Sequence, residues 1–86
     1  MRILTHRNFD KAYMKLRDGE KNRFKERRNM FLNNPFYPML NNHALNGKYV
    51  GCRSINIGGD LRAIFKMLNE KTALFVDVDT HPNLYK

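Results

Sequence analysis

The first third of the sequence spaces its hydrophobic residues as two helices would. In the first helix, which we expect to begin after an N-cap at Asn8 and to end at Gly19, apolar side chains recur every three or four positions. They are Phe9, Ala12, Tyr13 and Leu16. A second helix is predicted from Glu20 to about Asn33, because Pro35 follows where a helix cannot continue. Its apolar side is expected to contain Phe24, Phe31 and Leu32.

The second half of the chain alternates apolar and polar residues, as strands do. Strands are predicted over Arg53–Ile57, Leu61–Leu68 and Thr72–Thr80, joined by tight turns, and residues 2–5 are a candidate fourth strand. The segment from the second helix to Gly51 is predicted to be a loop. We therefore expect one α+β domain over residues 1–86, with an N-terminal helical hairpin packed on a small antiparallel sheet.

The alternation also predicts which side of the sheet the helices cover, because successive side chains of a strand point to opposite faces. The covered side is expected to hold the apolar set Ile55, Ile57, Leu61, Ala63, Phe65, Met67, Leu74, Val76 and Val78. The opposite parity is polar: Ser54, Asn56, Asp60, Arg62, Asp77, Asp79 and His81. The sequence therefore predicts an uncovered face on which acids, an arginine and a histidine lie together.

Charge narrows the class of partner. The 86 residues carry sixteen Lys and Arg against eight Asp and Glu, a formal charge of +8, and ten of the basic residues fall within residues 1–43. A folded domain of this charge favours a polyanionic partner such as nucleic acid. A single cysteine excludes an internal disulfide, and no apolar run approaches the roughly 18 residues of a membrane span. The start of the sequence also lacks the apolar segment of a signal peptide, so we expect a cytoplasmic protein without a membrane partner.

Candidate chemistry rests on proton transfer, since no metal, cofactor or nucleotide motif stands out. His43 lies in the long loop, His81 ends the last strand, and with Asp60 they form a candidate acid–base set. Cleaving RNA without a metal needs a base, an acid and cations that hold the charge of the transition state. The candidate cations are Lys48, Arg53 and Arg62. The spacing alone favours ordinary structural or solvated surface residues over a catalytic site.

Two stretches of the sequence resemble the RelE/ParE superfamily of toxins. The run from His43 to Phe65 (HALNGKYVGCRSINIGGDLRAIF) is similar to the YafQ-like pattern of His-x-Leu-x-Gly, three residues, Gly-x-Arg, then Asp-Trp-Arg and an apolar strand. The run from Asp79 to Tyr85 (DTHPNLY) is similar to that family's closing Gly-Thr-His-x-x-Leu-Phe/Tyr. Together the two runs cover about half the chain, and the predicted helices and opening strand match the remainder in order and length.

The resemblance implies a RelE-like fold and the toxin of a type II toxin–antitoxin system. Such toxins are mRNA interferases, endoribonucleases that cut mRNA in the ribosomal A site, and the activity expected here is metal-independent and needs no cofactor. The resemblance implies catalytic roles for His43, Asp60 and His81, and makes Tyr85 the aromatic residue that positions or activates the substrate. Its implied partners are a cognate antitoxin, the ribosome and mRNA, with operator DNA bound only through the antitoxin complex.

The arginines of the family's central hairpin correspond to Arg53 and Arg62 in this chain. For each of them, contact with RNA phosphate and a scaffold salt bridge are both open, and Arg53 shares its parity with the apolar Ile55 and Ile57. Lys48 and Asn56 are further candidates for holding phosphate.

Three positions depart from the YafQ-like pattern. Asn56 stands where such toxins often carry another catalytic histidine, and an asparagine can hydrogen-bond RNA but cannot transfer a proton at neutral pH. Leu61 replaces the usual tryptophan, and Asp79 replaces a glycine, which places a carboxylate beside His81. Two alternatives therefore stay open: a ParE-like toxin that inhibits gyrase, and a catalytically weak relative that only binds its antitoxin.

Overall fold

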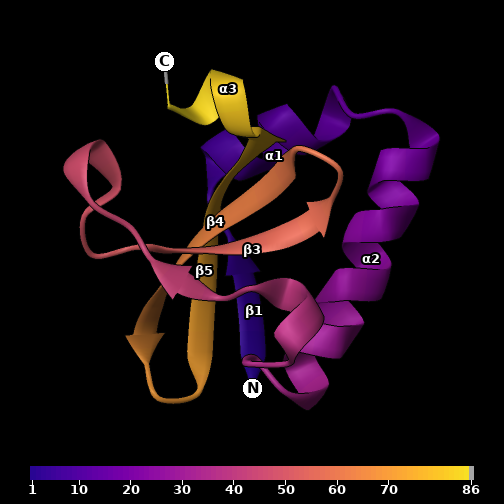
Figure 1. The fold of residues 1–86 in the computed structure, drawn as a ribbon. Coiled ribbons are helices and arrows are strands. Elements are labelled where there is room, and N and C mark those ends of the chain that lie inside the picture. Colours follow the sequence, from indigo (N-terminus) through magenta and orange to yellow (C-terminus); the bar gives the residue numbers. More distant parts are fainter. Residues whose placement is uncertain (86) are drawn as a thin grey trace.

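The helical hairpin and the strands expected from the sequence form an α+β fold in the computed structural model, which describes residues 1–85. In chain order the elements are β1 (Arg2–Thr5), α1 (Arg7–Met14), α2 (Asp18–Asn33), η1 (Pro38–Leu40), β2 (His43–Ala44), η2 (Gly47–Tyr49), β3 (Arg53–Gly58), β4 (Leu61–Asn69), β5 (Thr72–Thr80) and α3 (His81–Leu84), where η marks a 3-10 turn. Helices α1 and α2 share one apolar core with the sheet, while α3 and the loop that contains η2 lie away from α2 (Figure 1).

Helix α1 is capped by His6, and the predicted cap at Asn8 is wrong. The Nδ1 atom of His6 accepts a hydrogen bond from the backbone N–H of Asn8 at 3.0 Å, which satisfies one of the amides left free at a helix start. The helix ends at Met14 rather than Gly19, since the N–H of Lys15 bonds a carbonyl three residues back and tightens the last turn.

Helix α2 begins two residues earlier than predicted and ends, as predicted, at Asn33. At its start the Glu20 carboxylate accepts a hydrogen bond from the backbone N–H of Arg17 at 2.9 Å. Leu32 was expected on the inner side but is 40% exposed, whereas Phe31 beside it is fully buried. Adjacent residues of a helix lie about 100° apart, so both cannot face the same narrow core.

The sheet has five strands in the order β1-β5-β4-β3-β2. The antiparallel meander β3-β4-β5 was predicted, and residues 2–5 do form a strand. This strand, β1, runs parallel to β5, so the sheet is mixed rather than wholly antiparallel. The short strand β2 lies within the predicted loop and pairs antiparallel with β3 through His43 and Ala44. Two paired residues leave no alternation that a sequence pattern could reveal.

The face of β5 that meets the helices differs from the prediction because the β4–β5 ladder is irregular. Ile64 pairs with Asp77 but its neighbour Phe65 pairs with Phe75, so Val76 is an extra residue. A bulge of this kind reverses the alternation beyond it. The core therefore takes Ala73 and Phe75 in place of the predicted Leu74 and Val76, while Val78 lies in the core as predicted. In β4 the expected core residue Met67 is 39% exposed.

Phenylalanine rings dominate the core between the helices and the sheet. The ring of Phe75 lies at its centre, fully buried, with four neighbouring rings at centroid distances of 5.2 to 5.9 Å. These are Phe9 of α1, Phe24 and Phe31 of α2, and Phe65 of β4. Most of these pairs are edge-on, the arrangement that aromatic quadrupoles favour, so this cluster joins both helices to the sheet.

The opposite face of the sheet is partly covered, which corrects the expectation of a fully open polar face. Leu45, Ile64 and Leu84 form a second buried cluster there, with Tyr49, Cys52 and Val76 packed against it. The loop that contains η2 and the short helix α3 thus lie over the middle of this face and leave its remainder exposed. Within residues 1–85, no helix has the length and apolar composition needed to cross a membrane.

Candidate functional site

Strand register brings together candidates that are distant in sequence. His43 of β2 is paired with Ser54 of β3, and two residues further along β3, Asn56 is paired with Arg62 of β4. Paired residues project to the same side with Cβ atoms about 4.5–5.5 Å apart. His43, Asn56 and Arg62 therefore lie on neighbouring strands and on one face. This is the face opposite the helices, because the intervening residue Ile55 belongs to the helix-side core.

The turn before β4 and the start of α3 bring in the remaining candidates. The backbone N–H of His81 donates to the carbonyl oxygen of Asp60 at 2.7 Å, which ties α3 to this turn. The Arg62 guanidinium folds over the same turn and donates to the carbonyls of Gly59 and Leu61 at 2.8 and 3.1 Å. Asp60, Arg62 and His81 are thus neighbours although 21 positions separate Asp60 from His81.

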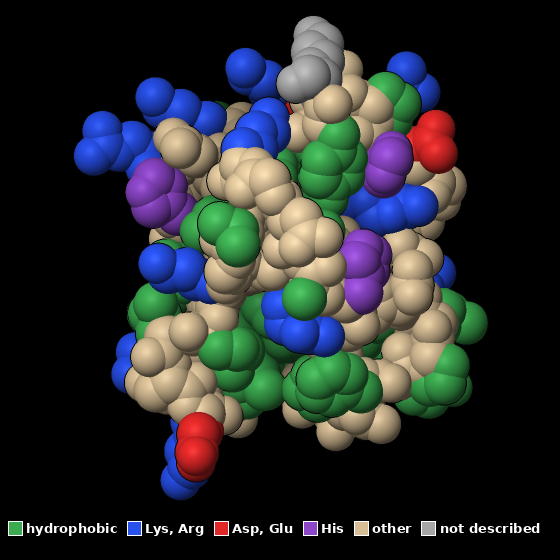
Figure 2. All heavy atoms as spheres, turned by 60° about the vertical axis from the view of Figure 1, so that its left-hand side comes forward, with side chains coloured by type: hydrophobic (Ala, Val, Ile, Leu, Met, Phe, Trp, Pro, Cys, Tyr) green, Lys and Arg blue, Asp and Glu red, His purple; other side chains and the backbone are tan. Residues whose placement is uncertain are grey.

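We call the surface formed by His43, Asn56, Asp60, Arg62 and His81 the histidine face. Figure 2 views the molecule from the side away from α2 and shows two histidine side chains close together, with a Lys or Arg side chain between them and an acidic side chain beside one of them. His43, Asp60 and His81 are all exposed, so a large substrate can reach them.

The His43 imidazole has a defined donor and acceptor. Its Nδ1 atom lies 2.8 Å from the backbone carbonyl oxygen of Asn41. A carbonyl oxygen can only accept a hydrogen bond, so Nδ1 carries the proton and Nε2 of the neutral ring is left with a free lone pair. His43 can therefore accept a proton at Nε2, which is the role of a general base.

The His81 side chain packs against aromatic residues. Its ring centroid lies 4.8 Å from that of Tyr85, and the Tyr85 ring in turn meets the Tyr49 ring edge-on at 6.0 Å. The Tyr49 hydroxyl donates to Oδ2 of Asp77 at 3.1 Å. Burial, followed by the nearby Asp77 carboxylate, raises the pKa of Tyr49 to about 12, so the phenol stays protonated and remains a hydrogen-bond donor.

Tyr49 is a member of this site that the sequence pattern did not identify. It lies in a loop with no regular spacing, whereas its partner Asp77 was expected on the polar side of the sheet. In the sequence, the one feature that could have indicated a role for Tyr49 is its aromatic ring, which stands between Lys48 and the apolar Val50.

The predicted phosphate-binding residues separate into two groups. Arg62 belongs to the histidine face, and the Lys48 ammonium lies 5.2 Å from the Tyr49 ring centroid, close to that face. Arg53 is not brought to this group. Its Nε donates to Oδ1 of Asn42 at 2.7 Å, and its guanidinium lies 5.5 Å from the Phe36 ring centroid. These contacts give Arg53 a scaffold role, and its contact with RNA phosphate stays a prediction.

Two polar groups beneath the histidine face are buried without a hydrogen-bond partner among the described residues: the hydroxyl of Ser54 and Oδ1 of Asn56. Most buried polar atoms in proteins are paired, and an unpaired one costs about 1–3 kcal/mol. Asn56 lies opposite Arg62 in the β-ladder, but its unpaired oxygen is buried and does not face an incoming ligand.

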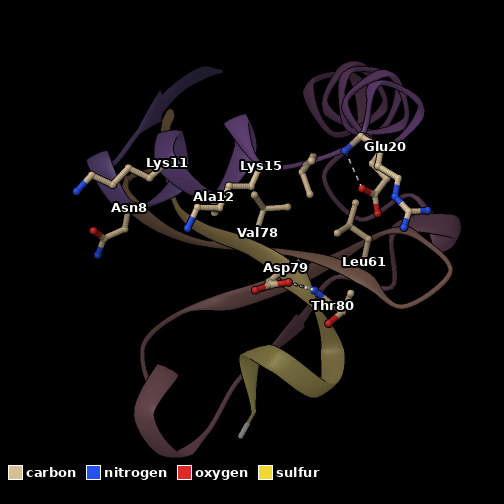
Figure 3. Close-up of a pocket in the computed structure, with 11 residues that line it drawn as sticks. Asn8, Lys11, Ala12, Lys15, Glu20, Leu61, Val78, Asp79 and Thr80 are labelled. Atoms are coloured by element: carbon tan, nitrogen blue, oxygen red, sulfur yellow. Dashed lines mark hydrogen bonds between the residues drawn. The ribbon is translucent and has the colours of Figure 1, made fainter.

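A concavity lies beside the histidine face, where α1 and the start of α2 meet the beginning of β4 and the end of β5. A cleft of about 490 Å³ separates α1 from the ends of β4 and β5 and is lined by Lys11, Lys15, Glu20 and Asp79 among others (Figure 3). None of the histidines lines it. The histidine face is instead an open surface, which suits an extended polymer better than a small molecule. Within residues 1–85, no three His, Cys, Asp or Glu side chains are grouped to hold a metal ion.

Comparison with known proteins relates this fold to toxins. The sequence matches no protein-family model, and no curated protein is significantly similar to it. Among solved structures, YafQ from E. coli superposes with a TM-score of 0.78 over all of both chains at 24% identity. A chain of the E. coli DinJ–YafQ toxin–antitoxin complex gives 0.79 at 22% identity over 98% of this chain and 96% of that one. A chain of the archaeal RelE–RelB complex from Pyrococcus horikoshii gives 0.73 at 21% identity over 93% of each. The chain therefore has the RelE-like fold that its sequence motifs led us to expect.

Proposed function

We propose that this chain is the toxin of a type II toxin–antitoxin system and that it cuts mRNA as a ribosome-dependent endoribonuclease. The observation that carries the proposal is the histidine face, on which two histidines, a carboxylate and an arginine from three separate segments meet on an open surface of a strongly basic protein. The fold shared with YafQ and RelE supports it.

The chemistry follows from the two histidines. Nε2 of His43 takes the proton of a ribose 2′-hydroxyl, and the resulting 2′-oxygen attacks the adjacent phosphorus. The bond from phosphorus to the 5′-oxygen breaks, and His81 in its protonated form gives its proton to that oxygen. The products are a 2′,3′-cyclic phosphate and a free 5′-hydroxyl. Each histidine ends in the protonation state in which the other began, so exchange of one proton with solvent at each ring resets the site.

The neighbouring side chains stabilise this reaction. Arg62 offers guanidinium hydrogen atoms to the phosphate oxygens, whose negative charge grows in the transition state. The Asp60 carboxylate lies at the same end of the face as His81. Its negative charge stabilises the positively charged form of His81 that the reaction requires. Tyr85 packs against the His81 ring and limits its rotation. The side-chain N–H groups of Asn56 can donate a hydrogen bond to RNA, but unlike a histidine at this position they cannot transfer a proton at neutral pH.

Dependence on the ribosome agrees with where the charge lies. Helix α2 has a net basic surface, since it carries Lys21, Arg23, Lys25, Arg27 and Arg28 against three acidic residues. Such a surface can hold ribosomal RNA phosphates while the histidine face holds mRNA. Binding through phosphates releases counterions, so affinity for the ribosome should fall steeply as the salt concentration rises.

The proposed partner that silences the toxin is an acidic antitoxin segment. A chain of charge +8 attracts a disordered acidic segment that folds as it binds. We also propose that the toxin contacts operator DNA only through its complex with the antitoxin, because the antitoxin then covers the basic surface of the toxin.

The decisive experiment measures cleavage of an mRNA by the purified protein with and without programmed ribosomes. Four proteins are compared: wild type, His43→Ala, His81→Ala and the control His6→Asn. Asparagine is a good helix cap, so the control removes a histidine while preserving the start of α1. We expect cleavage only with ribosomes, a loss of about 100-fold or more in the two histidine variants, and normal cleavage in the control.

Each other result has a definite meaning. If both His43→Ala and His81→Ala cut as fast as wild type, the proposed mechanism is wrong. Cleavage of free RNA would keep the nuclease and remove the ribosome from the proposal. Absence of cleavage under all conditions would favour the two alternatives, a gyrase inhibitor and a catalytically weak relative that only binds its antitoxin; Asn56, which stands where YafQ-like toxins often have a histidine, favours the weak relative. A DNA supercoiling assay with purified gyrase tests the gyrase inhibitor directly.

A further inference from the structure

The side chain of Tyr49 lies in a loop but is held by a hydrogen bond to the sheet and by an aromatic contact. Its hydroxyl donates to Oδ2 of Asp77 at 3.1 Å, and Oδ1 of the same carboxylate accepts the backbone N–H of Val78 at 2.8 Å. Both oxygens of Asp77 are therefore committed, and the acceptor is rigid because it belongs to a central strand of the sheet. The hydrogen bond holds the Tyr49 ring over the face that carries His81.

The Tyr49 ring is the outer support of an aromatic stack that ends at His81. It meets the Tyr85 ring edge-on, at an interplanar angle of 86°, and the Tyr85 ring lies against the His81 imidazole with a tilt of 53°. Tyr85 thus contacts both the Tyr49 ring and the His81 imidazole. Edge-on aromatic pairs are stabilising beyond their burial, so these contacts favour one orientation of Tyr85 over others.

Helix α3 has few other means of orienting His81. It spans only residues 81–84, and its buried residue is Leu84. The backbone of His81 is tied to Asp60, but within residues 1–85 no hydrogen bond to the imidazole is found. The position of the imidazole therefore depends on the ring of Tyr85, and Tyr85 is itself 39% exposed and supported by Tyr49.

We propose that Tyr49 is a positioning residue that acts through Tyr85 to hold the imidazole of His81 in the orientation for proton transfer. The inference rests on the proposed function in so far as His81 is the general acid, but the geometric part of it concerns the ring alone. A misplacement of a reacting group by 1 Å can cost up to about 100-fold in rate, so the support of a single ring matters to an acid that must reach one oxygen atom.

The first test is kinetic and uses matched substitutions. Tyr49→Leu keeps an apolar side chain and removes the ring, Tyr49→Phe keeps the ring and removes the hydroxyl, and Tyr37→Leu makes the same change at an exposed tyrosine outside the site. On programmed ribosomes we expect Tyr49→Leu to lower kcat about tenfold with a smaller effect on KM, because the ring orients an acid and reaches RNA only through its contact with Lys48. Tyr49→Phe should recover most of kcat, and Tyr37→Leu should match wild type.

A double-substitution cycle tests whether Tyr49 acts through Tyr85. In a Tyr85→Leu background, Tyr49→Leu should cause no further loss of kcat, since the ring that it supports is already gone. Independent losses that multiply would overturn the proposal. So would an equal loss of kcat in Tyr49→Phe and Tyr49→Leu, because the ring would then not be the part that matters.

A second measurement needs no cleavage activity. The imidazole protons of the three histidines are followed by NMR, and the signals of His81 are assigned with His81→Gln. Because an adjacent aromatic ring shifts nearby resonances, Tyr49→Leu should move the His81 signals and leave those of His6 in place, while Tyr37→Leu should move neither. Unmoved His81 signals in a folded Tyr49→Leu protein, or in Tyr85→Leu, would refute the inference. If the wild type cuts no RNA, the proposed function fails while this measurement still decides the geometry.

Discussion

The hydrogen bond between Tyr49 and Asp77 makes the stability of this protein depend on pH in the alkaline range. Burial and the Asp77 carboxylate raise the pKa of the phenol from 10.0 to about 12 in the folded protein. In the unfolded chain the phenol ionises at its ordinary pKa. The stabilising contribution is therefore complete below pH 10 and is lost as the pH rises towards 12, because the unfolded state gives up its proton first.

The size of the effect follows from the shift. Two pKa units correspond to about 2.7 kcal/mol at most, and solvent access to the partly buried ring reduces this to about 1–2 kcal/mol. At pH 11 the phenol of the unfolded chain is largely ionised, whereas that of the folded protein is largely protonated. We expect about 1 kcal/mol of this contribution to disappear between pH 9 and pH 11.

Urea unfolding of wild type and Tyr49→Phe at several pH values between 8 and 11 measures the contribution. Other groups that titrate in this range are common to both proteins and cancel in the difference between their free energies of unfolding. That difference should be greatest at pH 8 and shrink with rising pH, while the control pair of wild type and Tyr37→Phe should show a constant difference. A difference for Tyr49→Phe that does not change with pH would contradict the reasoning, as would one that grows.

Three further substitutions test other parts of the structure by urea unfolding at neutral pH. Phe75→Leu should lower the free energy of unfolding by about 2–3 kcal/mol, because it removes the ring at the centre of the aromatic core. Ser54→Ala should raise it by about 1 kcal/mol, since the buried hydroxyl has no partner among the described residues, and a loss of stability would reveal one. Gly58→Ala should lower it by about 1–3 kcal/mol, because Gly58 has a φ of +137° and an added Cβ would lie 3.1 Å from Arg23; an unchanged value would disprove the strain.

Much of the fold was predictable because the helices and the meander each repeat a period over many residues. Helix α2 and strands β3 to β5 were found from such periods. Which side chains of β5 point towards the helices was not predictable. One extra residue, Val76, reverses the alternation, and the sequence around it gives no sign of a bulge. The parallel pairing of β1 was likewise hidden, since the direction of a neighbour depends on the path of the helices between β1 and β5.

The candidate site divides in a similar way. His43, Asp60, Arg62 and His81 were identified from chemistry and from a resemblance, and the register brings them to one face. Tyr49 was missed because its role depends on contacts with residues 28 and 36 positions away. A loop residue whose partners are distant in the sequence leaves no local pattern. Its contacts are therefore visible only in the three-dimensional structure.

The pairing of β1 with β5 has a consequence for the order in which the molecule is made. The first strand has no partner until residues 72–75 have been synthesised, and Asp60 has no contact with His81 until later still. Because these contacts join distant parts of the chain, the sheet cannot close early during translation. A nascent chain that lacks residues 72–81 therefore has its basic helices but lacks His81, the proton donor that we propose. On that proposal, a ribosome meets the complete histidine face only after residue 81 has been synthesised.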